Sequence, residues 1–259
     1  MKNNKSLGQH WLKDRAILDE IAELALGNTE SAPDAAESRL CLEIGPGLGT
    51  LTSSLLKLFP SVLAVEFDQR LAENLPKSFP GKNLTVVNED FLKFDLETIK
   101  YPYVVAGNIP YYITSPIIMK LLETKNKPDN IVLLIQKEVA ERIAEGAGKH
   151  TVLSLSVQNL AEVELGPIVK KDLFTPPPKV DSQVIILRPR KSPLISDEAI
   201  NLAKRAFSAP RKKLVKNLSS FYSVSSLKAA LLELGLSPDL RPSDPALETW
   251  EKLLQILQK

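Results

Sequence analysis

Short apolar runs alternate with helical segments along the first half of the chain, and this alternation constrains the fold most strongly. The apolar runs are continuous, as in residues 40–44 and 131–135. Continuous apolar strands are buried on both faces, which is typical of a parallel sheet with helices on each side. The other expected strands are residues 62–66, 84–87 and 104–106, and the expected helices between them are residues 50–58 and 68–75. The sequence therefore predicts an α/β fold with a mostly parallel sheet.

The pattern changes near residue 191, after which only helical segments are expected. They cover residues 197–207, 211–219, 225–234 and 245–257. We therefore expect two domains, an α/β domain over residues 1–190 and a small all-helical domain over residues 191–259. At the other end of the chain, Asp14 is expected to begin an amphipathic helix, and residues 27–38 are expected to form a surface connection.

Composition excludes several classes of protein. The chain has 259 residues, 44% of them hydrophobic, which is enough for a packed core. No apolar run approaches the roughly 20 residues of a membrane span, and the first residues resemble no secretion signal. Cys41 is the only cysteine, and with His10 and His150 it makes no recognisable metal site. We expect a cytoplasmic monomer without metal or membrane contact.

The net charge of +2 conceals a basic segment between residues 188 and 216. Only Asp197 and Glu198 oppose its basic residues, which are Arg188, Arg190, Lys191, Lys204, Arg205, Arg211, Lys212, Lys213 and Lys216. Such a run is often only a solvated face, but its spacing also suits the phosphates of a folded RNA. The charge alone leaves both interpretations open.

A glycine loop follows the first expected strand and begins a helix. Its glycines, Gly45, Gly47 and Gly49, have the spacing Gly-x-Gly-x-Gly, which differs from the Gly-x-Gly-x-x-Gly of dinucleotide sites. The preceding Glu43 disfavours a pyrophosphate and suits a cationic ligand. Glu66 ends the next strand, where a carboxylate accepts ribose hydroxyls. This combination favours S-adenosylmethionine over NAD, with Asp90 as an acceptor for the adenine amino group.

A second candidate site follows the strand at residues 104–106, where the chain reads Asn108-Ile109-Pro110-Tyr111. Pro110 fixes its own φ and restricts Ile109, which holds the Asn108 amide, the Ile109 carbonyl and the Tyr111 ring rigidly. Such groups accept hydrogen bonds from an amino group and stack on the ring that carries it. The alternative is a strand-ending turn with a packed tyrosine.

Several motifs together make the chain similar to the ribosomal RNA adenine N6,N6-dimethyltransferases, most closely their bacterial small-subunit branch. They are residues 5–9, 43–49, 108–111, 136–142 and 174–182. The resemblance implies a Rossmann-like methyltransferase domain, S-adenosylmethionine as methyl donor, and the small ribosomal subunit with its 16S rRNA as partner. It also implies donor contacts from His10, Leu12, Gly45, Gly47, Glu66, Asp90 and Asn108.

The family commonly has Asn-Phe where this chain has His10-Trp11, and often Asn where it has Tyr112. The resemblance further implies a flipped adenine between Tyr111 and Phe174. The alternative for Phe174 is a core side chain before a rigid proline turn. The phosphate contacts implied for the helical domain are Arg211, Lys212, Lys213 and Lys216.

The family's activity is dimethylation of N6 on two adjacent adenosines in the 3'-terminal hairpin loop of small-subunit rRNA, during subunit biogenesis. Three alternatives stay open. One is a large-subunit rRNA methyltransferase of the erythromycin-resistance type, and another is a DNA adenine methyltransferase. The third is a non-catalytic ribosome-assembly or transcription partner on the same scaffold.

Overall fold

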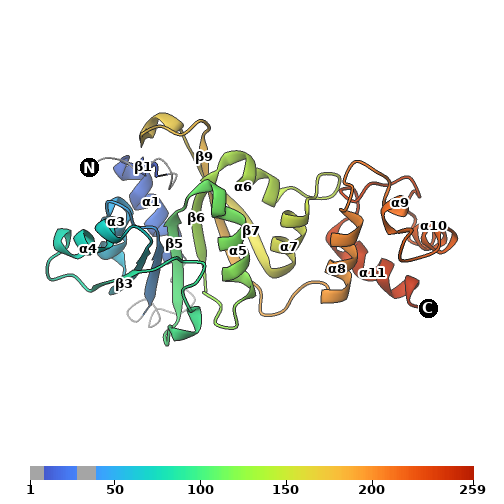
Figure 1. Cartoon of the computed structure of the whole chain (residues 1–259), viewed down its shortest axis with the longest axis horizontal. Coiled ribbons are helices and arrows are strands. Elements are labelled where there is room, and N and C mark those ends of the chain that lie inside the picture. The colour runs from blue at the N-terminus through green and yellow to red at the C-terminus, as the bar shows by residue number, and fades with distance from the viewer. Residues whose placement is uncertain (1–8, 28–38) are drawn as a thin grey trace. The chain divides into compact units, whose positions relative to one another are not determined.

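The computed structural model describes residues 9–27 and 39–259. The chain folds into two compact units (Figure 1). The first comprises residues 1–140 and 162–189, and the second comprises residues 141–161 and 190–259. The expected division at residue 190 therefore differs from these units in one segment, residues 141–161. The physical reason is that Leu155 of helix α7 (Val152–Leu160) packs in the apolar core of the C-terminal helices.

The first unit is built on a seven-stranded sheet whose strand order is β4-β3-β2-β5-β6-β9-β7. The pairs from β4 to β6 are parallel, whereas β9 runs antiparallel to β6. This confirms the mostly parallel sheet. In this order the strands are Leu84–Asn88, Ser61–Glu66, Leu40–Ile44, Tyr103–Asn108, Ile131–Gln136, Ser182–Pro189 and Ala161–Val169.

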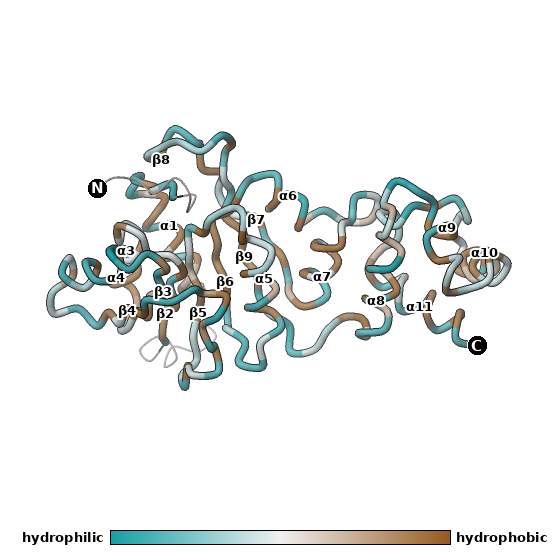
Figure 2. The backbone as a smooth tube through the Cα atoms, in the orientation of Figure 1, coloured by the Kyte–Doolittle hydropathy of each residue, from teal (hydrophilic) through white to brown (hydrophobic). Residues whose placement is uncertain are grey.

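Helices cover both faces of the sheet, which explains the continuous apolar strands shown in brown in Figure 2. Helices α1 (Arg15–Leu26) and α3 (Thr50–Leu58) share one apolar cluster with alternate strand residues such as Cys41 and Val104. The intervening strand residues, Leu42 and Val105, are also fully buried. Asp14 caps α1, because its carboxylate accepts a hydrogen bond from the Ile17 amide at 3.1 Å.

The remaining elements of this unit connect or border the strands. Helices α4 (Gln69–Asn74), α5 (Thr114–Glu123) and α6 (Lys137–Ala144) follow β3, β5 and β6, and α6 continues past Ala140 into the second unit. A short antiparallel pair joins β1 (Trp11–Leu12) to β8 (Phe174–Thr175). Single helical turns cover Leu75–Ser78, Leu96–Thr98, Tyr111–Ile113 and Lys171–Leu173.

After residue 190 the described elements of the second unit are helices, as the sequence predicts. They are α8 (Asp197–Ala206), α9 (Leu214–Leu218), α10 (Val224–Glu233) and α11 (Leu247–Leu257). Their core surrounds Trp250, which is fully buried. Ser196 and Ser223 cap α8 and α10, because their side chains accept hydrogen bonds from backbone amides of the first turn. Two sequence expectations, the motif at residues 5–8 and the connection at 28–38, lie outside the described residues.

Candidate active site

A cavity lies at the carboxyl ends of four parallel strands in the first unit. Its described lining comes from the segment at residues 9–11, the glycine loop after β2, the ends of β3 and β5, and the loop after β4. The sequence-predicted residues His10, Gly45, Gly47, Glu66, Asp90 and the run Asn108–Tyr111 all line it. The fold therefore brings together groups that lie far apart in the sequence, because parallel strands end at one edge.

The glycine loop is shaped by left-handed backbone. Gly45, Gly47 and Gly49 have φ values of 65°, 57° and 81°. At Gly49 a Cβ atom would also lie only 2.7 Å from Leu75 Cδ1, so a side chain there requires a shift of its neighbours. The loop thus depends on glycine both for its dihedral angles and for its close packing at the start of α3.

Glu66 closes the loop from strand β3. Its Oε2 accepts a hydrogen bond from the Gly47 amide at 2.9 Å, and its Oε1 accepts one from the Asp68 amide at 2.8 Å. Burial raises the pKa of this carboxyl group, although the two backbone amides oppose the rise. A carboxylate has about four acceptor positions, so these bonds fix its orientation and leave capacity for ligand hydroxyls.

The loop after β4 is held from two directions. Asp90 Oδ1 accepts a hydrogen bond from the Leu92 amide at 3.0 Å. Lys120 of α5 donates to the Leu92 carbonyl at 2.9 Å, and its ammonium lies 5.8 Å from the centre of the Phe91 ring. Phe91 is buried and lines the cavity. The loop therefore presents a fixed carboxylate next to an apolar ring.

Asn108 ends strand β5 with one side of its amide already engaged. Its Nδ2 donates a hydrogen bond to the backbone carbonyl of His10 at 2.9 Å. Oδ1 therefore remains as the amide's acceptor in the cavity wall. The following Pro110 has φ −60° and ψ 134°, which is the extended turn expected from the sequence.

Tyr111 is anchored by its hydroxyl and faces another ring. Its hydroxyl forms a 2.7 Å hydrogen bond with Ser182 Oγ, and burial raises the pKa of this phenol. The His10 ring lies nearly parallel to it, with an interplanar angle of 19° and centroids 6.1 Å apart. His10 Nδ1 is itself 2.8 Å from the Pro176 carbonyl oxygen. The Tyr111 ring is thus oriented at both its edge and its face.

Two sequence-predicted residues are not brought to the cavity. Leu12 and Phe174 face each other across the β1–β8 pair and are 1% and 3% exposed. Both belong to the apolar cluster of the main sheet, and neither lines the cavity. The structure therefore corrects the expected stacking position of Phe174 to the core position that the sequence left open. Apolar burial accounts for this placement.

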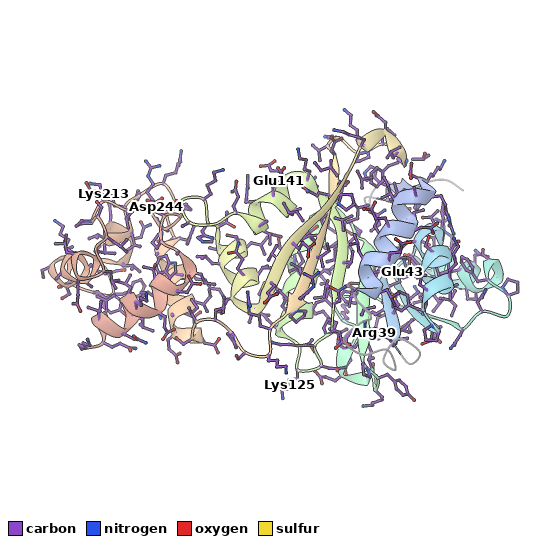
Figure 3. All side chains as sticks on the ribbon, turned by 180° about the vertical axis from the view of Figure 1, so that it is seen from behind. Arg39, Glu43, Lys125, Glu141, Lys213 and Asp244 are labelled. Atoms are coloured by element: carbon purple, nitrogen blue, oxygen red, sulfur yellow. The ribbon has the colours of Figure 1, made fainter. Side chains whose placement is uncertain are left out.

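The predicted phosphate contacts lie in the second unit, in the loop between α8 and α9 and in α9 itself. Arg211, Lys212, Lys213 and Lys216 are all exposed. Lys213, labelled in Figure 3, also donates to Asp239 at 2.6 Å. Exposed ion pairs contribute little to stability, so this one does not prevent Lys213 from contacting a phosphate.

The cavity also contains residues that the sequence-predicted site omitted. Trp11, Phe67 and Tyr112 line it, and the latter two are 62% and 64% exposed. Glu43 lines it as well, although only 1% of this residue is exposed. The sequence already connects this carboxylate with a cationic ligand, but Glu43 was not among the predicted contact residues.

Burial is the main cause that raises the pKa of the Glu43 carboxyl to about 8. The nearby Glu66 adds to this rise, and the polar groups of Thr52 in α3 oppose it.

In the described part of the chain, no His, Cys, Asp and Glu side chains gather into a group able to hold a metal ion. No described helix is long and apolar enough to cross a membrane.

Several known proteins are similar to this chain in sequence and in structure. The family model described as ribosomal RNA adenine dimethylase matches residues 1–259. Ribosomal RNA small subunit methyltransferase A of Nostoc sp. is 41% identical, with 99% of this chain and 98% of the relative covered. The protein of the same name from Enterococcus faecalis is 38% identical, with 98% and 90% covered.

Two solved structures cover nearly the whole chain. A dimethyladenosine transferase from Plasmodium falciparum has a TM-score of 0.79 at 29% identity, and covers 95% of this chain and 96% of its own. The 23S rRNA methyltransferase ErmE has a TM-score of 0.76 at 30% identity, and covers 96% of this chain and 100% of its own. The Rossmann-like methyltransferase fold expected from the motifs is confirmed, and the chain belongs to the ribosomal RNA adenine dimethylase family.

Proposed function

We propose that this protein transfers methyl groups from S-adenosylmethionine to N6 of two adjacent adenosines in the 3'-terminal hairpin loop of 16S rRNA. It does so in the cytoplasm, during biogenesis of the small ribosomal subunit. The observation that carries the proposal is the Asn108 amide, which is fixed by the His10 carbonyl at the cavity wall. Membership of the dimethylase family supports the reaction type, and the names of the most similar relatives support the small subunit as substrate.

The cavity residues suit the methyl donor. Glu66 is positioned to accept the ribose hydroxyls, and Asp90 beside Phe91 suits the adenine ring and its amino group. The left-handed glycine loop allows the backbone to approach the ligand closely. The donor carries its methyl group on a positively charged sulfonium sulfur. None of the described lining residues is Lys or Arg, so no permanent positive charge in the wall repels this cation.

Asn108 and Ile109 act on the target amine. The lone pair of an adenine N6 is delocalised into the ring, which makes the amine a poor nucleophile. Hydrogen bonds from its two N–H groups to Asn108 Oδ1 and the Ile109 carbonyl draw the nitrogen toward a tetrahedral form. Its lone pair then attacks the methyl carbon. The carbon–sulfur bond breaks with its electron pair remaining on sulfur, and one proton of the amine passes to solvent. Positioning and electrostatics supply the catalysis.

Tyr111 holds the base. An enzyme that modifies a base removes it from its stack, and an aromatic side chain offers a replacement surface. The hydroxyl bond to Ser182 keeps this ring at the cavity after the rigid Pro110. The same ring must hold the monomethylated base for the second transfer. We assign Tyr111 as the principal stacking surface, since Phe174 is buried in the core.

The helical part, residues 191–259, acts as the RNA-binding domain in this proposal. Its exposed residues Arg211, Lys212, Lys213 and Lys216 lie on one short stretch that leads into α9. Lysine and arginine that contact phosphates add a salt-dependent, sequence-independent component of affinity. Folded RNA is recognised mainly through such backbone contacts and its shape.

A second candidate function is methylation of large-subunit rRNA, which the similarity to ErmE supports. Isotopically labelled donor should be offered with small subunits, large subunits, free rRNA and DNA, followed by nucleoside mass spectrometry. We expect N6,N6-dimethyladenosine in the small-subunit reaction and none with Asn108→Ala. Label in the large subunit would favour the second candidate, label in DNA would favour a DNA methyltransferase, and no label in any reaction would favour a non-catalytic assembly partner.

A further inference from the structure

A guanidinium group lies over an exposed aromatic ring in the second unit. Phe221 is in the turn between α9 and α10, and 51% of this residue is exposed. Arg205 is in the last turn of α8, and the central carbon of its guanidinium lies 4.7 Å from the centre of the Phe221 ring. This distance is that of a cation–π contact. The two side chains therefore present a flat ring and a positive charge together at the surface.

The apolar core of the unit does not account for the position of Phe221. The next residue, Tyr222, packs against the cluster that contains Trp250, whereas Phe221 is not part of that cluster. An isolated exposed ring is common on protein surfaces and indicates no ligand by itself. The guanidinium over this ring and the charge around it distinguish it from such a residue.

Hydrogen bonds hold the ring at a fixed place. The Phe221 amide donates to the Leu218 carbonyl at 2.9 Å, so the turn continues directly from α9. Asn217 of α9 donates from Nδ2 to the Ala206 and Ala209 carbonyls at 2.6 and 2.9 Å. These bonds tie α9, and the turn after it, to the end of α8. The ring and the guanidinium are therefore preorganised, which lowers the entropic cost of binding a ligand.

The charge around the pair is positive. Every charged residue in the segment 204–221 is basic. Within the described part of the chain Arg205 forms no ion pair, so no carboxylate neutralises its charge. The two acidic residues of α8, Asp197 and Glu198, lie in the first turn, at the opposite end of the helix from Arg205. A positive surface of this kind attracts a polyanion.

An unpaired nucleobase with its phosphates matches this surface. A base stacks on an aromatic ring because both have flat π-faces, and bases splayed out of single-stranded RNA are commonly bound in this way. A guanidinium has five N–H donors, so one that lies over a ring still has N–H groups for phosphate oxygens. A ring on a basic surface therefore suits an unstacked base better than a duplex, in which the bases already stack on one another.

We propose that Phe221 and Arg205 form a stacking site for an unpaired nucleobase of the RNA substrate, with Arg205 on the adjoining phosphate. This base differs from the target adenine, because Phe221 belongs to the second unit and does not line the cavity beside Tyr111. The inference rests on the proposed role of residues 191–259 in RNA binding. It adds a contact with a base to that role, whereas the contacts predicted at residues 211–216 are with phosphates alone.

A salt titration separates stacking from charge. Binding of the full-length protein to unmodified 16S rRNA, transcribed in vitro, should be measured by filter binding at several salt concentrations. Phe221→Ala should lower the affinity by about 5- to 150-fold, the usual contribution of one stacked base. The slope of log affinity against log salt should stay unchanged, because a ring releases no counterion. Arg205→Gln should lower the affinity and also reduce that slope by about one.

Two conservative variants and a matched control identify the interaction. Phe221→Trp keeps a π-face and should retain most of the affinity. Phe221→Leu keeps an apolar side chain without a π-face, and should bind as weakly as Phe221→Ala. Tyr101→Ala removes another exposed aromatic ring, which belongs to the first unit and does not line the cavity, and it should bind normally.

The tryptophan variant also reports the contact directly. A base stacked on an indole quenches its fluorescence, so the rRNA should quench Phe221→Trp more strongly than Tyr101→Trp. Both variants share Trp11 and Trp250, so the emission of these two residues cancels in the comparison. If Phe221→Ala does not fold, this measurement still decides the question.

The outcomes separate the stacking site from the proposed function. Normal affinity of Phe221→Ala or Phe221→Leu, or equal quenching in the two tryptophan variants, overturns the stacking site and leaves the proposed function standing. A reduced salt slope in Phe221→Ala also overturns it, because the ring would then act only by positioning Arg205. Failure of the unmodified protein to bind the rRNA overturns the RNA-binding role proposed for residues 191–259, and the stacking site with it.

Discussion

The side-chain amide of Asn108 is bound to the backbone carbonyl of His10, 98 residues earlier in the chain, by a 2.9 Å hydrogen bond from Nδ2. In the proposed mechanism this bond leaves Oδ1 to accept from the target amine, because Nδ2 is already engaged. It also attaches the amino-terminal segment to the end of the central strand. The amide therefore joins two segments of the cavity wall that lie far apart in the sequence.

Asn108→Ala should lower the turnover number by about 10²–10³-fold, the usual effect of removing one preorganised polar group from a reacting centre. The dissociation constant for S-adenosylhomocysteine should change far less. Single-turnover methylation and calorimetry measure the two quantities separately. As a control, Asn108→Asp keeps an acceptor oxygen but loses the donor to His10. Near-normal turnover in the alanine variant would contradict the role of the amide.

Phe174→Ala should reduce stability rather than only turnover. The side chain is 3% exposed and packs in the main apolar cluster, so its truncation should cost about 3–5 kcal/mol of unfolding free energy. Urea denaturation measures this value. If Phe174 stacked on the base, its truncation would instead weaken RNA binding by about 1–3 kcal/mol and leave the urea midpoint unchanged. That second pattern would return Phe174 to the catalytic site.

Tyr111→Phe tests the anchor separately from the ring. The variant loses the 2.7 Å bond to Ser182 but keeps the aromatic face, so we expect a stability loss of about 0.5–1.5 kcal/mol with methylation largely retained. Tyr111→Ala should lose most turnover. The ratio of monomethyl to dimethyl product should also rise in that variant, because the base is held less firmly for the second transfer. Equal turnover in both variants would exclude a stacking role.

Replacing Lys212 and Lys213 with Glu should weaken RNA binding and flatten its dependence on salt. Each phosphate contact contributes close to one unit to the slope of log affinity against log salt. A matched control places the same charge change at Lys252 and Lys259, which are exposed near the end of the same unit. Filter binding at several salt concentrations compares the two. Equal slopes in both would mark the basic segment as a solvated face.

The stability of the folded protein should fall between about pH 5 and pH 8. The pKa of Glu43 is raised to about 8 in the folded state, above its value in the unfolded chain. An acid raised in this way stabilises the fold fully below the unfolded pKa, and this stabilisation is lost as the pH rises toward 8. Glu66, whose pKa is also raised, contributes in the same direction.

Glu43→Gln should flatten this decline, since one raised group contributes at most about 1.4 kcal/mol per pH unit. Unfolding free energies at pH 5, 6, 7 and 8 measure the slope, with Glu89→Gln as the control. A Glu43→Gln variant whose stability falls as steeply as that of the unmodified protein would contradict the buried neutral acid.

Local sequence patterns determined most of the fold and the cavity residues at the carboxyl ends of the strands. Continuous apolar runs identified the parallel strands because such runs are stable only when both sheet faces are covered. The residues that follow those strands, among them Glu66, Asp90 and Asn108, were predictable because carboxyl ends of parallel strands meet at one edge. The glycine spacing in the loop after residue 44 favoured S-adenosylmethionine over NAD, because a tight glycine turn is set by the local backbone conformation.

Tertiary structure alone decided which of the predicted side chains are buried and which atoms each of them contacts. The motif at residues 174–182 suggested a stacking ring, yet pairing of β8 with β1 places Phe174 against Leu12 in the core. The bond from Asn108 to the His10 carbonyl joins segments too distant for any local pattern to connect. Glu43 was visible as a charge in an apolar run, but its burial depends on strands packed on both sides. The burial of a side chain and its hydrogen-bond partners depend on packing between distant segments, so they cannot be predicted from the periodicity of one segment.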